Sequence, residues 1–104
     1  MKHHFWEAIC SDERQLGINK IQEIVSRFGS LIDFKLFSDI SISMVIELSE
    51  NKMNLLYNSL STYMKVEREV PLNEETNKEI CLYLNITFTK GKGDQQNVSP
   101  EVPG

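Results

Sequence analysis

Two stretches of the sequence decide the fold: ISISMVIEL at residues 40–48 and ICLYLNITF at residues 80–88. In both, a large apolar residue occupies every second position, and mostly smaller or more polar residues stand between them. Because the side chains of a strand alternate between its two faces, each stretch predicts a β-strand with one apolar face. The apolar positions are Ile40, Ile42, Met44, Ile46 and Leu48 in the first stretch and Ile80, Leu82, Leu84, Ile86 and Phe88 in the second.

Shorter alternating patterns predict further strands around these two. Residues 3–10 and 31–38 alternate in the same way, and the second of these leads through a tight turn into the strand that begins at Ile40. Its predicted apolar face carries Ile32, Phe34 and Leu36. Residues 66–70 form a short alternating run that a proline ends, and the polar residues 73–79 predict a loop.

Helical spacing marks two other segments. After Ser11 and Asp12, either of which is a suitable N-cap, apolar residues recur at intervals of three and four up to Gly29, which is expected to end the helix in a left-handed conformation. A second helix is expected to open at Ser49 and Glu50. Its predicted apolar stripe consists of Met53, Leu56, Tyr57, Leu60, Tyr63 and Met64.

The order of these elements predicts an α+β fold. A β-α-β-β-α-β order with one extra strand is most simply packed as a ferredoxin-like α/β plait, an antiparallel sheet with two helices on one face. Residues 1–90 would form this single domain, and residues 91–104 an irregular C-terminal tail. The pattern leaves open which of the two late strands pairs with the first one.

Composition limits the classes of function. The chain has 104 residues, of which 40% are hydrophobic and 25% charged, as in one ordinary globular domain. Its 11 basic and 15 acidic residues give a net charge of -4, whereas a nucleic-acid surface needs clustered basic residues. No apolar stretch approaches the roughly 20 residues that span a bilayer, and no signal peptide is recognisable. We therefore expect a cytoplasmic protein that binds neither nucleic acid nor a membrane.

The residue types that most often carry catalysis are sparse. His3 and His4 are the only histidines, and as neighbours in a strand they would point to opposite faces, which prevents joint binding of one metal ion. Cys10 and Cys81 have no evident base beside them and are expected to be buried thiols. The sequence thus predicts no catalytic constellation, no metal site and no cofactor.

One set of features between Glu7 and Leu48 carries a family resemblance. It comprises a strand ending in Cys10-Ser11-Asp12-Glu13-Arg14, a helix with Ile21, Ile24 and Val25, the turn Phe28-Gly29-Ser30-Leu31-Ile32, and the strand pair that follows. These features are similar to the first half of an ACT domain, a small regulatory module that binds ligands. In that family an aspartate near the first loop helps to hold an amino-acid ligand across a dimer interface. The resemblance therefore implies ligand-binding roles for Asp12 and Arg14.

The side chains between the apolar positions are the other candidates for function. They are Ser41, Ser43, Val45 and Glu47 in the first strand and Cys81, Tyr83, Asn85 and Thr87 in the second. They would give the face of the sheet opposite the helices a polar lining. Together with Glu7 of the first strand, Tyr83 and Asn85 are the candidate ligand-binding residues on that face.

These observations favour a non-catalytic small-ligand-binding or regulatory domain. It would act as a homodimer that pairs through the sheet face or an edge strand, because Phe5, Ile9 and Phe37 place apolar surface opposite the helices. The alternative is a small enzyme of the dimeric α+β barrel type, with a pocket between two sheets that contains Glu7 or Tyr83. A third hypothesis is an interaction protein whose residues 98–104 dock on another chain.

Overall fold

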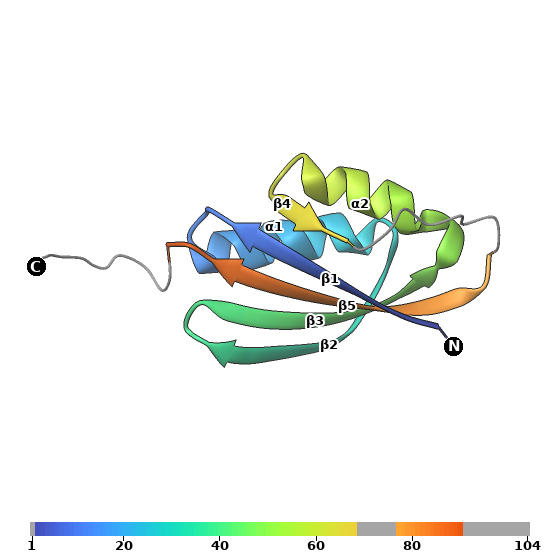
Figure 1. The fold of residues 1–104 in the computed structure, drawn as a ribbon, viewed down its shortest axis with the longest axis horizontal. Coiled ribbons are helices and arrows are strands. Elements are labelled where there is room, and N and C mark those ends of the chain that lie inside the picture. The colour runs from blue at the N-terminus through green and yellow to red at the C-terminus, as the bar shows by residue number, and fades with distance from the viewer. Residues whose placement is uncertain (1, 69–76, 91–104) are drawn as a thin grey trace, which may run out of the picture.

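The structure, a computed structural model, describes residues 2–68 and 77–90, and it places five strands and two α-helices in them. The predicted α+β class is confirmed. In chain order the elements are β1 (Lys2–Cys10), α1 (Arg14–Ser26), β2 (Gly29–Ser38), β3 (Ser41–Ser49), the 3-10 turn η1 (Glu50–Lys52), α2 (Met53–Ser61), β4 (Lys65–Glu67) and β5 (Glu79–Phe88) (Figure 1). The predicted tail at residues 91–104 and most of the predicted loop before β5 lie outside the described residues.

The five strands form one mixed sheet in the order β2-β3-β5-β1-β4. β5 lies at its centre, antiparallel to β3 and parallel to β1, whereas β4 pairs antiparallel with the other edge of β1. The predicted all-antiparallel sheet is therefore wrong at the interface of β1 with β5. Both late strands pair with β1, which answers the question that the pattern left open. A parallel pair needs a long connection, and the chain between Cys10 and Glu79 provides it.

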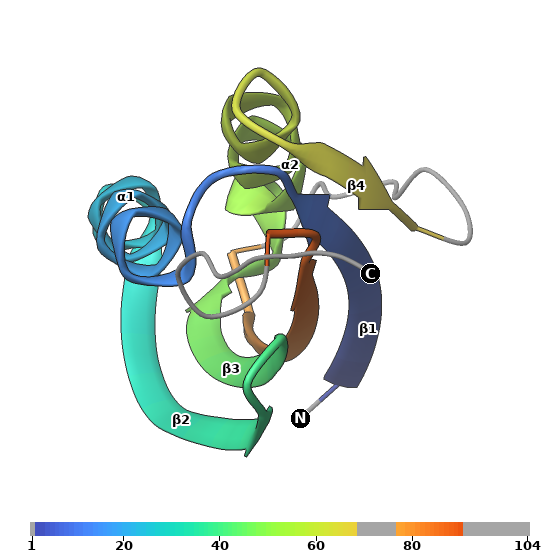
Figure 2. The ribbon, with the colours of Figure 1, turned by 90° about the vertical axis from the view of Figure 1, so that its left-hand side faces the viewer.

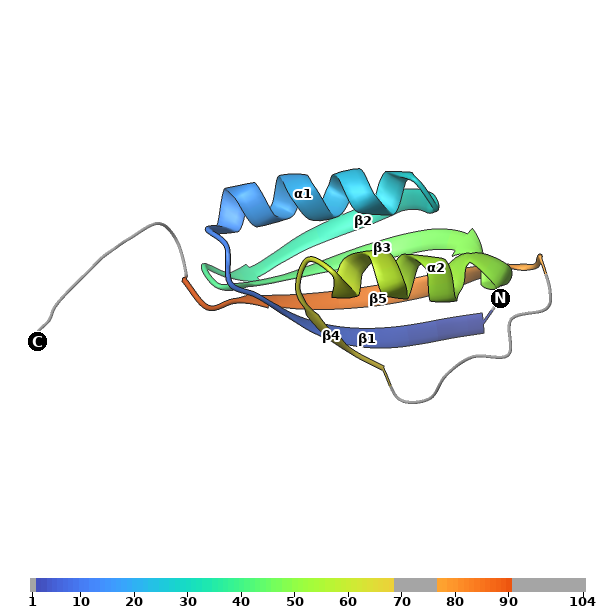
Figure 3. The same cartoon turned by 90° about the horizontal axis from the view of Figure 1, so that it is seen from above.

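Both helices lie on the same side of the sheet, α1 beside β2 and α2 beside β4, and the core lies between the two layers (Figure 2 and Figure 3). The central strands supply the sheet side of this core: Met44 is directly opposite Leu84, and both are 0% exposed. The predicted apolar face is confirmed along all of β5 and from Ile42 to Leu48 in β3. Ile40 is the exception, because it lies in the turn before β3 and is 45% exposed.

Helix α1 starts with a different cap from the predicted one. Glu13, not Ser11 or Asp12, is the N-cap residue, and its carboxylate accepts hydrogen bonds from the amides of Gln15 and Leu16 at 2.9 and 3.2 Å. These two hydrogen bonds lower the pKa of the Glu13 carboxyl. The first turn of a helix needs an acceptor for its free amides, and the sequence offers three adjacent residues that could supply one.

Gly29 is predicted to end α1 in a left-handed conformation. Instead, it is the first residue of β2 and does not adopt that conformation. The C-cap is Arg27, in right-handed helical geometry. A Cβ added at Gly29 would lie 2.5 Å from the carbonyl oxygen of Glu47 and 2.7 Å from Cβ of Leu48. Glycine is therefore required at this position by the close approach of β2 to β3.

A register shift in β2 changes which of its side chains face the core. The pairing with β3 shifts between Leu31 and Asp33, which leaves Ile32 in a bulge. Leu31 and Phe34 pack against the core, whereas Ile32 is 53% exposed and Leu36 is 58% exposed. The predicted apolar face of β2 is thus confirmed at Phe34 and wrong at Ile32, because the extra residue reverses the alternation there. Leu36 pairs with the core residue Ile42 and so shares the face of Phe34, but it is not buried.

Candidate functional site

The face of the sheet opposite the helices, called the open face below, presents its side chains in rows across β3, β5 and β1. The register of the strands places the members of each row side by side. The four rows are Glu47, Cys81 and His3; Val45, Tyr83 and Phe5; Ser43, Asn85 and Glu7; and Ser41, Thr87 and Ile9. The predicted candidates Glu7, Tyr83 and Asn85 therefore all lie in the two middle rows.

Phe5 and Tyr83 form an aromatic stack in the middle of the open face. Their ring centroids are 4.9 Å apart, and the ring planes differ by 15°. His3 adds a third ring, 5.5 Å from that of Tyr83. A hydrogen bond with Cys81 raises the pKa of Tyr83. Phe5 remains 59% exposed in spite of the stack, which leaves apolar surface in contact with solvent.

Glu7 and Asn85 meet beside this stack. The Asn85 amide donates a hydrogen bond from Nδ2 to Oε2 of Glu7 at 3.2 Å. Toward the β4 edge, Phe5 and Glu7 line an open hollow of about 270 Å³ together with Glu67 and Arg68. The hollow thus combines an aromatic ring with two carboxylates, which suits a polar group of a partner or ligand. The guanidinium of Arg68 is engaged elsewhere, 3.9 Å from the centre of the Tyr57 ring on α2 and hydrogen-bonded to Asn54.

The structure does not bring Asp12 and Arg14 to this face. Asp12 lies in the loop between β1 and α1, where its Oδ2 accepts a hydrogen bond of 2.7 Å from the Tyr63 hydroxyl. The Cys10 thiol donates to the same hydroxyl at 3.7 Å. Burial, followed by the hydrogen bonds with Asp12 and Cys10, raises the pKa of Tyr63 far above its ordinary value. Asp12 thus ties the end of β1 to the end of α2, while Arg14 begins α1.

Removing the Tyr63 hydroxyl tests the contribution of its hydrogen bond with Asp12 to stability. Tyr63→Phe is expected to lower the free energy of unfolding by about 1–2 kcal/mol, because a partly buried hydrogen bond to a carboxylate is lost. Tyr57→Phe is the matched control, since its hydroxyl donates to a neutral acceptor, the Val66 carbonyl, at 3.3 Å. The control is expected to cost about 0.5 kcal/mol. Urea denaturation followed by circular dichroism measures both, and equal losses would contradict the charged tie.

The histidines and cysteines lie as the alternation predicts. His3 contacts Tyr83 on the open face, whereas His4 lies on the core side of β1 with its Nε2 atom buried. Cys10 and Cys81 are free thiols, and both are buried as expected. Cys10 faces the core and Cys81 the open face, so neither pair converges on one site.

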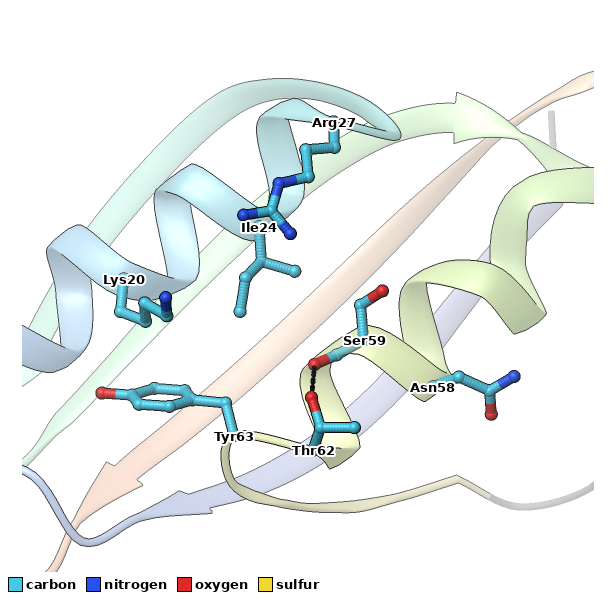
Figure 4. Close-up of a pocket in the computed structure, with 7 residues that line it drawn as sticks. All are labelled: Lys20, Ile24, Arg27, Asn58, Ser59, Thr62 and Tyr63. Atoms are coloured by element: carbon cyan, nitrogen blue, oxygen red, sulfur yellow. Dashed lines mark hydrogen bonds between the residues drawn. The ribbon is translucent and has the colours of Figure 1, made fainter.

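A second hollow, between the two helices, contains residues that the sequence patterns did not single out. It has a volume of about 430 Å³ and is drawn in Figure 4. Lys20 of α1 and Arg27, the C-cap residue of that helix, lie on one side of it, and polar residues from the end of α2 lie on the other. The sequence signal that could have indicated this hollow is the spacing of Lys20 and Arg27, which lie about two turns apart on one helix face.

No group of three or more His, Cys, Asp or Glu side chains is placed to hold a metal ion within residues 2–68 and 77–90. In the same part of the chain, neither helix combines the length and the apolar character that crossing a bilayer requires. Comparisons of this chain with protein-family models, with curated proteins and with solved structures find no match.

Proposed function

We propose that this protein is a homodimeric interaction domain whose two copies pair through their open faces. The observation that carries the proposal is the Phe5–Tyr83 stack, which presents apolar surface in the middle of the face and has polar side chains around it. Protein interfaces have the same composition, with aromatic anchors inside a polar rim. Covering Phe5 in a dimer would contribute about 1–2 kcal/mol per copy.

The order of residues across the rows supports a second copy as the partner. β5 is the middle strand of the sheet. A two-fold axis that lies between the two faces and runs parallel to β5 would reverse the strand order in the partner. Each row would keep its position along the direction of β5. Val45 would then face the partner's Phe5, and Tyr83 would face the partner's Tyr83. In the row of Val45, Tyr83 and Phe5, each apolar side chain would thus meet an apolar side chain of the partner.

Charged side chains at the margins of the face are complementary in the same arrangement. Lys35 on β2 and Glu67 on β4 stand at opposite ends of one row, so Lys35 would face the partner's Glu67. Glu47 would face the partner's His3. The charged pairs at the rim would determine the relative orientation of the two copies more than the affinity of the dimer.

Phe5→Glu is expected to dissociate the dimer, with a rise in the dissociation constant of about 30-fold or more, because a central aromatic anchor is replaced by a charge. Leu55→Glu is the matched control. Leu55 lies on α2 and is 55% exposed, so the same change on the helix side should leave association unchanged. Sedimentation velocity over a concentration series that reaches the millimolar range measures both variants. A wild-type chain that stays monomeric throughout, or equal effects of the two variants, would overturn the proposal.

The hollow beside Glu7 favours one second candidate, a small enzyme of the dimeric α+β barrel type. Two facing sheets would enclose the hollow, and Glu7 would act as its general acid or base. A structure of the dimer separates the two candidates. A closed pocket around Glu7 would support the enzyme, whereas tight packing of Val45 against the partner's Phe5 would support the interaction domain.

A further inference from the structure

The hollow between α1 and α2, called the helix groove below, lies on the side of the sheet away from the open face (Figure 2). Its volume of about 430 Å³ falls within the range of small-molecule pockets. Ile24 of α1, which is 3% exposed, lies at its base. The polar residues that line it are Lys20 from α1, Arg27 from the C-cap of α1, and Asn58, Ser59, Thr62 and Tyr63 from the end of α2 and the turn after it (Figure 4).

Positive charge exceeds negative charge in the helix groove. Lys20 and Arg27 contribute two cations, whereas α2 (Met53–Ser61) contains no charged side chain. Glu23 is in contact with both cations, at 3.8 Å from Lys20 Nζ and 3.8 Å from Arg27 Nη2. These three side chains are about half exposed, so the ion pairs are weak. This local surplus contrasts with the net charge of -4 for the whole chain.

The two ends of the groove offer different neighbouring groups. At one end, the side chains of Arg27 and Ser59 reach toward each other across the groove, and at the other end Lys20 lies near Tyr63 (Figure 4). The Thr62 hydroxyl already donates to the Ser59 carbonyl at 2.7 Å, and the Tyr63 hydroxyl donates to an aspartate outside the groove. The Ser59 hydroxyl therefore adds a donor across the groove from the guanidinium, while the Tyr63 ring adds apolar surface.

We propose that the helix groove binds a small phosphate monoester. The Arg27 guanidinium donates to two phosphate oxygens through its planar fork, and the Ser59 hydroxyl donates to a third. Lys20 supplies a second positive charge, which matches the double negative charge of a phosphate monoester near neutral pH. The carbon part of the ester lies over Ile24 and the Tyr63 ring.

Titration of the full-length ¹⁵N-labelled chain with phenyl phosphate in low-salt buffer tests the site by chemical-shift perturbation. Saturable shifts are expected at Lys20, Arg27 and residues 58–63. Lys20→Gln and Arg27→Gln are each expected to weaken binding about tenfold, because each removes a charge-assisted contact. Glu23→Gln is expected to tighten binding about two- to fivefold, because it removes the competing carboxylate. Lys35→Gln, on β2 in the other layer, makes the same charge change and should leave binding unchanged.

Further ligands and variants keep the proposal falsifiable. Inorganic phosphate should bind more weakly than phenyl phosphate, and equal affinity would overturn the role of the ester group. Succinate should bind more weakly still, and equal affinity would overturn the preference for phosphate. The absence of saturable shifts, or an equal loss of affinity in Lys35→Gln, would overturn the site itself. Arg27→Lys keeps the charge without the fork and replaces Arg27→Gln if that variant does not fold.

The helix groove and the open face can be tested separately, because they lie in different layers of the fold. Phe5→Glu is expected to bind phenyl phosphate with unchanged affinity even though its dimer dissociates. Arg27→Gln is expected to dimerise normally. Loss of phosphate binding in Phe5→Glu would show that the site depends on the dimer and would overturn the groove as a site within one chain.

Discussion

Leu84→Ala is expected to lower the free energy of unfolding by about 2–5 kcal/mol. Leu84 lies near the centre of β5, is 0% exposed, and is paired with Met44 on β3 and with Trp6 on β1. The cavity would open among side chains of three adjacent strands, which cannot close over it without moving the sheet. Since small domains are stable by about 5–15 kcal/mol, this loss is a large part of the total.

Thr87→Ala is the matched control for Leu84→Ala. Thr87 is exposed on the opposite face of the same strand, so its change is expected to stay within about 0.5 kcal/mol. Trp6 is the single tryptophan, and it is 2% exposed, so its fluorescence reports unfolding in urea. All variants must be compared at one protein concentration, because self-association adds to the apparent stability. Equal losses from the two substitutions would contradict the assigned faces of β5.

Gly29→Ala is expected to lower the free energy of unfolding by about 1–3 kcal/mol through overpacking. The added Cβ would lie 2.5 Å from the Glu47 carbonyl oxygen, so β2 and β3 must move apart at the start of their hairpin. Alanine also restricts the unfolded chain, which by itself stabilises by about 0.4–1 kcal/mol. The steric cost dominates because the nearest atom belongs to a paired backbone and not to a flexible side chain.

Ser30→Ala is the control for Gly29→Ala, because Ser30 is the next residue of β2 and is exposed. Its effect is expected to stay within about 0.5 kcal/mol. Thermal and urea unfolding, again followed by Trp6 fluorescence, measure both variants. If Gly29→Ala were as stable as Ser30→Ala, the close pairing of Gly29 with Leu48 would be wrong.

The candidate site could be predicted only in part. Alternation alone places Tyr83 and Asn85 on one face of their strand and Glu7 on one face of another. The hydrogen bond of Glu7 with Asn85, and the stacking of Phe5 on Tyr83, depend on the parallel pairing of β1 with β5. An antiparallel pairing would reverse the direction of β1 and match the same residues differently. Direction leaves no mark on an alternating pattern, so these contacts could not be foreseen.

The residues at which helices and strands begin and end could not be predicted from local sequence patterns either. Glu13 caps α1 in place of Ser11 or Asp12, and all three offer a side-chain oxygen close to the free amides. The role of Gly29 arises from the approach of β3, a strand that begins more than ten residues later in the chain. The role of Gly29 thus depends on packing against a distant segment, which the flanking residues do not encode.

Periodicity was sufficient to predict the strands at the centre of the sheet, the two helices and the buried face of β5, because a side chain's face follows from its position in its own element. The strand order β2-β3-β5-β1-β4 and the mixed sheet required the packed fold, since they depend on which segments pair and in which direction. The helix groove required it as well. Lys20 and Arg27 become part of a site only because α2, with no charged residue, packs beside them.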